Sequence, residues 1–477
     1  MRPLRAAAAL VFLAATAVAA PKTRVIFFFD TEDYVCDRSN DAIRDIANLL
    51  DSEGVRGNFN VAGFLATRIV ELRRLDVIEA LKPHVIGTQT LYHSRHPNVA
   101  ELGDDPSYER AYRLTMAAEA KGVGMLDAAF GEGRCVFQCP PGNSVSAVAM
   151  DVYSDLGIPF SGGCGFTEAE ESKVYSLMVG RPGAETLGLW YFNQYHLPYY
   201  LPFHLESMLP SGGRACPDFK AALDGMAQYD FAGLYMHPHM AVKSTHWDGP
   251  NYRKGNLVRW REWRQVADRD PADTAVFYER LRAFIRAVKA DGRFEITDIE
   301  ALRTTLKPRV TITKKDIPAI RAALTADFNC IREPASWSVA DAFQAVVRLL
   351  RGETEYRPGK VYGFLARPKG VSAPVTVSAA DLAEAAAKID LSTFIPAEIA
   401  VGGKAVGPAD FLFAALEALE TGATAVEVRP REQLGSFKEV PGIEHMDISG
   451  KWIHPDSFRD SYLSERLRLQ LWTLRIE

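Results

Sequence analysis

The sequence lacks the features that mark nucleic-acid-binding and membrane-spanning proteins. Its 477 residues contain no basic cluster and their formal net charge is only −5, so we expect no nucleic-acid partner. After the N-terminal segment, no apolar run reaches the roughly 20 residues that a transmembrane helix needs. The composition, 47% hydrophobic and 24% charged, is instead typical of a folded globular chain. The length is sufficient for two domains.

Several common catalytic and metal-binding motifs are also missing. Ser144 lacks the flanking glycines of a nucleophile elbow, and no glycine-rich loop suited to phosphate is present. No second Cys/His pair with zinc-finger spacing accompanies Cys135 and Cys139. For these two cysteines the sequence leaves two alternatives open, a disulfide or buried thiols.

The N-terminus has the pattern of a signal peptide. Arg2 and Arg5 precede an apolar run over residues 6–20, and Ala17-Val18-Ala19 supplies small residues at the spacing of a signal peptidase site. A membrane anchor is the alternative, but the run is short for crossing a bilayer. We therefore predict that residues 1–20 are removed and that the mature chain is exported to the periplasm, cell surface or medium without an integral membrane segment.

Strands and helices alternate along the first part of the chain. "TRVIFFFDT" is a continuous apolar run typical of a buried parallel strand, and residues 39–54 have helical apolar spacing before Gly54. This alternation predicts the α/β class, with a parallel sheet covered by helices, over residues 21–308. Residues 309–477 are Ala-rich in part and predict a smaller, mainly helical C-terminal domain.

Polar residues with catalytic potential follow three of the predicted strands. They are Asp30, Glu32 and Asp33, then His84, His93 and His96, and finally His237 and His239. The carboxyl ends of parallel strands meet at one edge of a sheet, so these groups are expected to share a site. A carboxylate with two histidines is a common ligand set for a divalent metal, and further acids and histidines can transfer protons. The pattern therefore predicts metal-assisted hydrolysis.

The order and spacing of these motifs resemble the polysaccharide deacetylase family. The resemblance runs over residues 23–305 and depends on the acids at 30–33 and on "NFNVAGF", "HVIG", "HSRHP" and "LYMH". It implies a distorted (β/α) barrel that removes acetyl groups from a carbohydrate or cell-wall glycan, usually at N-acetylglucosamine. It also implies a divalent metal ion, with zinc as the first choice and cobalt or nickel as alternatives.

The resemblance also implies roles for individual residues. Asp30 corresponds to the catalytic base and His237 to the general acid. Glu32 is the first choice for the acidic metal ligand and Asp33 the second, although Asp33 could instead cap the next helix. His93 corresponds to a metal-binding histidine, whereas His84 is interpreted as structural.

Two positions depart from the family pattern. Gln89 stands where the first ligand histidine is expected, and an amide is a weaker ligand for zinc-like ions than imidazole. His96 is therefore a candidate to complete the metal site. Gln138 replaces an arginine that would hold the catalytic base. Gln89, Gln138 and Pro140 are predicted to contact substrate instead.

Two further expectations concern binding to sugars. Trp190 and Tyr191 belong to an aromatic segment that could line a sugar groove or could lie in the core. Residues 394–419 resemble a pseudomurein-binding repeat, which implies attachment to a cell-wall glycan, whereas a helical packing module is the alternative. Two other functions also stay open: a glycan-binding protein with little catalysis, and a hydrolase of another C–N bond.

Overall fold

The structure is a computed structural model in which residues 22–143, 146–161, 188–197, 200–210, 215–436, 453–459 and 461–476 are described. The predicted signal peptide lies outside these ranges, as does Cys164. Within them, no helix is both long and apolar enough to cross a membrane.

Strand β1 (Thr23–Thr31) pairs with three other strands of the large sheet. Its apolar run buries seven of nine residues in succession after Arg24, as expected of a strand covered on both faces. One edge of β1 pairs in parallel with β9 (Phe231–Met236). β1 also pairs in parallel with β10 (Phe294–Thr297) through its first half and with β2 (Asn58–Val61) through its second half.

The remaining strands extend this sheet in an order close to that of a barrel. From β2 the order continues through β3 (Val85–Thr88), β4 (Cys135–Gln138), β5 (Phe160–Ser161) and β7 (Gln194–His196), all in parallel, and β8 (Tyr200–His204) pairs with β9. Antiparallel strands β6 (Leu189–Tyr191) and β17 (Arg475–Ile476) follow β7. No pairing joins β8 to this end of the sheet among the described residues. The α/β class and the distorted, barrel-like sheet are therefore confirmed.

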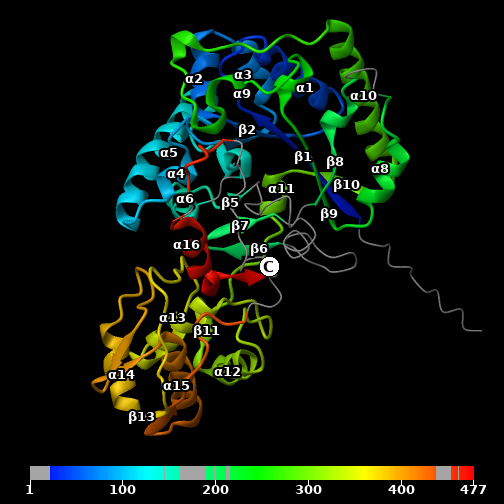
Figure 1. Cartoon of the computed structure of the whole chain (residues 1–477). Coiled ribbons are helices and arrows are strands. Elements are labelled where there is room, and N and C mark those ends of the chain that lie inside the picture. Colours follow the sequence, from blue (N-terminus) through cyan, green and yellow to red (C-terminus); the bar gives the residue numbers. More distant parts are fainter. Residues whose placement is uncertain are drawn as a thin grey trace, which may run out of the picture.

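Helices cover the outside of this sheet (Figure 1). The first, α1 (Ser39–Ser52), buries Ile43, Ile46 and Leu50, the positions whose spacing predicted it, and Gly54 follows it with a φ of +65°. The others are α2 (Gly63–Glu71), α3 (Leu75–Leu81), α4 (Val99–Gly103), α5 (Tyr108–Phe130), α6 (Ala147–Asp155), α8 (Phe219–Met226), α9 (Gly249–Tyr252), α10 (Pro271–Ala290) and α11 (Ile299–Arg303).

The C-terminal region is mainly helical, with three small two-stranded sheets. Its helices are α12 (Ile317–Ala326), α13 (Val339–Leu350), α14 (Ala379–Lys388) and α15 (Pro408–Thr421). The sheets pair β11 (Ile312–Thr313) with β12 (Glu355–Tyr356), β13 (Val375–Ser378) with β16 (Ala425–Val428), and β14 (Ile399–Val401) with β15 (Lys404–Val406). Gly402 and Gly403, both with positive φ, form the turn between β14 and β15.

The last part of the chain returns to the barrel. Helix α16 (Leu463–Leu469) lies between the barrel and the C-terminal helices (Figure 1), and β17 adds to β6 of the large sheet. One apolar core also contains residues from both parts, including Met150 and Tyr191 together with Phe343 and Trp472. The division at residue 308 stays a prediction. The barrel has a large core of its own, and a few barrel residues also belong to the C-terminal core.

The structure shows two cysteine side chains as buried thiols, one of the two alternatives that the sequence left open for Cys135. Cys36 and Cys135 are both buried as thiols. Burial raises the pKa of Cys36 to about 12, with the nearby Asp33 adding to the effect. These two side chains therefore act as small apolar core groups.

The buried imidazole of His196, the last residue of β7, makes the stability of the fold depend on pH. Burial lowers the pKa of His196 in β7 to about 4, from an ordinary value near 6.5. Between these pH values the unfolded chain binds a proton that the folded chain does not, so the free energy of unfolding falls as pH falls from 6.5 to 4. We predict that this decrease in the free energy of unfolding is smaller in His196→Gln than in wild type, by up to about 3 kcal/mol. Urea unfolding at pH 7 and pH 4.5 checks it, and an unchanged pH dependence would contradict it.

Candidate metal centre

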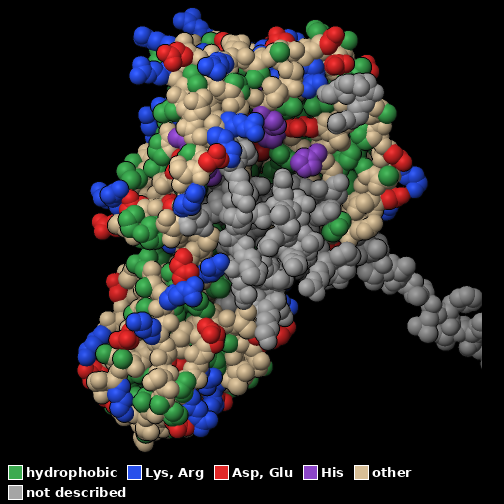
Figure 2. Space-filling view, in the orientation of Figure 1, with side chains coloured by type: hydrophobic (Ala, Val, Ile, Leu, Met, Phe, Trp, Pro, Cys, Tyr) green, Lys and Arg blue, Asp and Glu red, His purple; other side chains and the backbone are tan. Residues whose placement is uncertain are grey.

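The candidate site lies at the carboxyl ends of β1, β3 and β9, where the sequence predicted it. Phe29 pairs with Met236 across the β1–β9 ladder, so the chain continues from these positions into Asp30 and His237 side by side. On the other edge of β1, Asp30 pairs with Asn60 of β2. In the space-filling view, histidine and acidic side chains lie next to each other on the barrel part of the molecule (Figure 2).

Three buried side chains form the centre of the site. Nε2 of His93 lies 2.6 Å from Oε2 of Glu32, and its Nδ1 lies 3.7 Å from Oδ2 of Asp248. Ligand atoms of these three residues all lie within 4.8 Å of one another. The indole of Trp247 donates to Oε1 of Glu32 at 3.0 Å, which fixes the carboxylate in place.

The loop that carries His93 has an unusual backbone. Thr90 and His93 have φ angles of +64° and +53°, a left-handed conformation that side-chain-bearing residues adopt only at a cost in free energy. The hydroxyl of Thr90 accepts a hydrogen bond from the backbone N–H of His93 at 3.1 Å. The strained turn points His93 back toward β1, and such strain is most often found at functional sites.

Charges in this group compensate each other. Burial alone would raise the pKa of Glu32, but His93 and His237 lower it well below the usual range. Burial opposes protonation of His93, yet Glu32 and Asp248 raise its pKa. Burial raises the pKa of Asp248, and Glu32 adds to this while His93 opposes it. The protein therefore holds Glu32 as an anion inside a poorly solvated site.

A second pair orients His237. Its Nδ1 lies 2.7 Å from Oε1 of Glu206, and the same oxygen accepts the backbone N–H of His237 at 3.0 Å. This leaves Nε2 of His237 facing Oδ2 of Asp30 at 3.8 Å and Oε1 of Glu32 at 4.0 Å. Burial opposes protonation, but Glu32, Glu206 and Asp30 together raise the pKa of His237 to about 10. The imidazole is thus prepared to donate a proton from Nε2.

Asp30 is held by two amides. Asn60 donates to Oδ1 of Asp30 at 2.7 Å, and Gln89 is also hydrogen-bonded to this carboxylate. Burial raises the pKa of Asp30, while His237 and the two amides oppose that change. The side chain keeps 13% exposure, against 2% for Glu32. Asp30 and His237 therefore lie on the side of the site that solvent reaches.

Asp33 and His96, both predicted as metal ligands, lie in other environments. Oδ1 of Asp33 accepts from the backbone N–H groups of Val35 and Cys36, and Oδ2 accepts from Ser39. Asp33 therefore fixes the turn into α1, the alternative named from the sequence. His96 is bound to Glu101 at 2.9 Å and to the carbonyl of Tyr252 at 3.0 Å, and it does not join the Glu32–His93–Asp248 group.

The residues predicted to contact substrate are distributed differently. Gln89 lies in the site on Asp30, whereas Gln138 donates to Ser161 at 3.1 Å, and Pro140 is buried after β4. Tyr191 is fully buried in the apolar core with its hydroxyl bonded to the carbonyl of Leu467. Of the two alternatives that the sequence left open for Tyr191, the structure shows the core, because its ring has no exposed face. Trp190 is half-buried against Tyr195 and Arg475.

Sequence reasoning did not identify Asp248, Glu206 or His246. Asp248 and His246 flank Trp247 in "STHWDG", a few residues after the "LYMH" motif. A carboxylate and a histidine so close to a predicted catalytic histidine were a usable signal. Glu206 lies in a short helical turn after β8, Leu205–Met208, and no local pattern distinguishes it from a surface acid.

The donor set fits a divalent cation. Oδ2 of Asp248 is buried without a hydrogen-bond donor among the described residues, and Oε2 of Glu32 is buried with only Nε2 of His93 beside it, at 2.6 Å. Together with an imidazole nitrogen they form the mixed oxygen–nitrogen set that zinc-like ions prefer. Buried carboxylate oxygens with no donor are costly unless a cation or water satisfies them.

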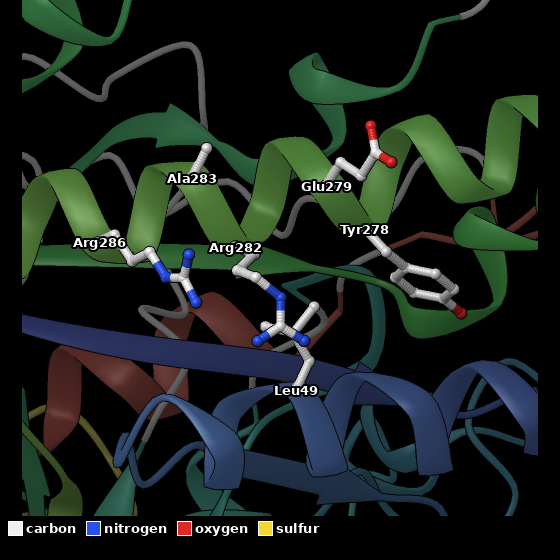
Figure 3. Close-up of a pocket in the computed structure, with 6 residues that line it drawn as sticks. All are labelled: Leu49, Tyr278, Glu279, Arg282, Ala283 and Arg286. Carbon is white, nitrogen blue, oxygen red and sulfur yellow. The ribbon is translucent and has the colours of Figure 1, made fainter.

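A pocket elsewhere has no part in this chemistry. It lies between α1 and α10 and is lined by Leu49, Tyr278, Arg282 and Arg286, among others (Figure 3). Both arginines form ion pairs with Glu53. The pocket holds none of the residues at the strand ends.

No protein-family model matches the sequence, and no curated protein matches it. A solved structure of a putative polysaccharide deacetylase from Mycobacterium smegmatis is 15% identical, with 61% of this chain and 94% of that one covered and a TM-score of 0.36. A CE4 family pseudoenzyme from Bacillus anthracis is 13% identical, with 59% and 65% covered and a TM-score of 0.33, so the match spans less than two thirds of that protein. A family 4 carbohydrate esterase from Streptomyces lividans, in complex with acetate, is 12% identical, with 56% and 90% covered and a TM-score of 0.30.

The ion pair between Glu206 and His237 predicts a measurable change in titration. Glu206→Gln removes a negative charge and should lower the pKa of His237 by at least about one unit in metal-free protein, since a nearby opposite charge shifts a pKa by this order. NMR titration of the imidazole checks this. The exposed Glu109→Gln serves as the control and should leave the pKa unchanged. An equal pKa in wild type and Glu206→Gln would contradict the described pairing.

Proposed function

We propose that this chain is a metal-dependent hydrolase that removes acetyl groups from a carbohydrate. The observation that carries the proposal is the buried Glu32–His93–Asp248 group with Asp30 and His237 beside it on the accessible side. The resemblance of the strand-end motifs to polysaccharide deacetylases supports the choice of an acetylated sugar as substrate. A divalent cation, with zinc as first choice, is the cofactor of this proposal.

A bound cation would polarise the acetyl carbonyl and make water a better nucleophile. Asp30 is the group that accepts the water proton, because its carboxylate faces the open side of the site. Charged His237 favours the ionised form of Asp30, which a base requires. His237 then donates its Nε2 proton to the leaving nitrogen or oxygen, while Glu206 stabilises the Nδ1–H side of the ring.

In this proposal, the side-chain amides of Asn60 and Gln89 stand beside the base Asp30, where the family pattern has an arginine. Asn60 and Gln89 hold Asp30 by neutral hydrogen bonds. Neutral donors lower a carboxyl pKa less than a guanidinium does. A base with a raised pKa is a stronger proton acceptor once ionised, and Gln89 acts as its positioning residue rather than as a metal ligand.

Export and glycan attachment belong to the same proposal. The pattern of residues 1–20 supports export to a compartment where cell-wall or extracellular glycan is available. The resemblance of residues 394–419 to a pseudomurein-binding repeat supports a glycan partner for the C-terminal region. In that part of the chain, Phe411 and Leu412 are buried in the apolar core, so any glycan would contact the outer face.

A glycan-binding protein with little catalysis is the second candidate. The position of Gln138 favours it, since this amide is bonded to Ser161 and no arginine of the described residues is bonded to Asp30. Retention of Asp30, His93 and His237 in one site favours catalysis instead. The two functions differ in one measurable product, free acetate.

We predict that metal and the three groups around it control acetate release. Purified mature chain supplied with Zn²⁺ or Co²⁺ should release acetate from N-acetylated chitooligosaccharides, and chelation should abolish the reaction. Asp30→Asn should lower kcat by a factor on the order of 10² to 10⁴, as for loss of a general base. His93→Gln and Asp248→Asn should instead lower metal affinity.

The exposed Asp390→Asn is the matched control for the carboxylate substitutions and should leave both measurements unchanged. Binding of the oligosaccharide without release of acetate, at saturating metal, would contradict the enzyme and support the glycan-binding protein. Metal binding that His93→Gln does not weaken would contradict the assigned centre.

A further inference from the structure

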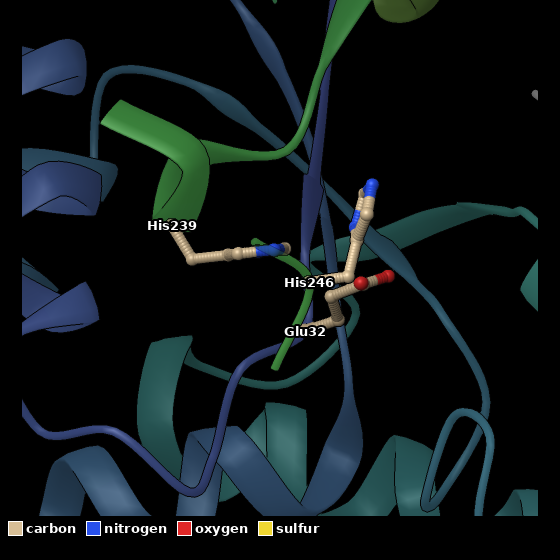
Figure 4. A group of neighbouring side chains, drawn as sticks. All are labelled: Glu32, His239 and His246. Atoms are coloured by element: carbon tan, nitrogen blue, oxygen red, sulfur yellow. The ribbon is translucent and has the colours of Figure 1, made fainter. Parts of the chain in front are cut away.

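A second group of metal-binding side chains adjoins the proposed centre. Ligand atoms of Glu32, His239 and His246 lie within 4.8 Å of one another. His239 and His246 come from the segment that follows β9, and the ring of His239 points toward the space beside the other two side chains (Figure 4). Their ring centroids are 5.4 Å apart.

His239 is an unusual buried residue. Only 2% of its surface is exposed, and neither ring nitrogen has a hydrogen-bond partner among the described residues. A buried polar group left without a partner costs on the order of 1–3 kcal/mol. A structural histidine in the same protein shows the contrast: His84 is bonded through both nitrogens, to the backbone of Gly57 and of Ala47. The imidazole of His239 therefore has a free lone pair inside the site.

Glu32 belongs to both groups. Its Oε2 contacts His93 at 2.6 Å, whereas its Oε1 faces the His237 side of the site at 4.0 Å. Oε1 also accepts the indole N–H of Trp247 at 3.0 Å. A carboxylate that belongs to two adjoining ligand groups can bridge two ions, as in two-metal hydrolases, where the ions lie about 3.5–4 Å apart.

Another group, Glu206, His237 and His246, shares His246 and competes for the same ion. Nδ1 of His237 is already bonded to Glu206 at 2.7 Å, and Oε1 of Glu206 also accepts the backbone N–H of His237. His239 has no such partner to give up. The unpartnered nitrogens therefore favour His239 over His237 as the ligand.

We propose that His239 and His246 bind a second divalent cation beside the first, with Glu32 bridging the two. Imidazole pairs with a carboxylate suit zinc, cobalt or nickel. His246 is exposed, so the remaining coordination positions of this ion face solvent and can take water or a substrate oxygen. The inference rests on the proposed function only for the identity of the first cation.

The test counts metal ions rather than product. Full-length mature protein is stripped with chelator, reloaded with Co²⁺ or Zn²⁺, desalted and analysed by mass spectrometry for ions per chain. Wild type should retain two ions, whereas His239→Leu and His246→Gln should each retain one. His93→Gln should also retain one, at the other position, and Glu32→Gln should lose both. The exposed His204→Gln is the matched histidine control and should retain two.

Magnetic coupling gives an independent readout. Two Co²⁺ ions bridged by a carboxylate are expected to couple, so the electron paramagnetic resonance signal per ion should be weaker in wild type than in His246→Gln. His246 is exposed, so its substitution tests the site without disturbing the core if His239→Leu fails to fold.

Each outcome decides the proposal. A wild-type value of one ion, or two ions unaffected by His246→Gln, would overturn it. Two ions in wild type with one in His246→Gln would support it even if no acetate were released, and that result would count against the deacetylase alone. Acetate release by a protein holding one ion would support the proposed function and exclude the second site.

Discussion

The site depends on keeping the carboxylate of Glu32 ionised where almost no water reaches it. An isolated buried charge is far too costly for a folded protein. Here His93 lies at 2.6 Å and the Trp247 indole donates at 3.0 Å, and these contacts bring in the loops after β3 and β9. The strained turn at Thr90 and His93, the burial of Asp248 and the orientation of His237 all surround this one anion. In the proposed function, a bound cation would supply the positive charge that protonated histidines supply to Glu32 in its absence.

The surroundings separate the groups to which the proposed function assigns metal binding from those to which it assigns proton transfer. Glu32, His93 and Asp248 are each at most 3% exposed, whereas Asp30 and His237 keep 13% and 14% of their side-chain surface. The three buried side chains contact one another, whereas the side chains of Asp30 and His237 face solvent. Neighbouring strands β1 and β9 produce this division directly, because their register places the two proton-transfer residues side by side.

Much of this arrangement was readable from the sequence, and the failures have physical reasons. Apolar runs ending in acids or histidines located β1, β9 and the edge at which they meet. For Asp33 the sequence left open a metal ligand or a structural role, because Glu32 and Asp33 follow the end of β1, where strand alternation no longer indicates direction; the carboxylate holds the turn into α1. The contacts of His96 could not be foreseen, because sequence spacing says nothing about a distant partner such as Tyr252. Glu206 and Asp248 lie in irregular segments, where neither helical nor strand periodicity indicates direction.

The pairing of β17 with β6 has a consequence for how the molecule is assembled. Residues Ile476 and Leu189 are partners in the sheet, although all the helices α10 to α16 lie between them in the chain. During synthesis, strands β1 to β5 can pair early. The pairing of β6 with β17 can form only after the long region between them has been synthesised. Contacts of such long sequence separation form slowly. The outer side of β6 is therefore among the last parts of the sheet to be paired.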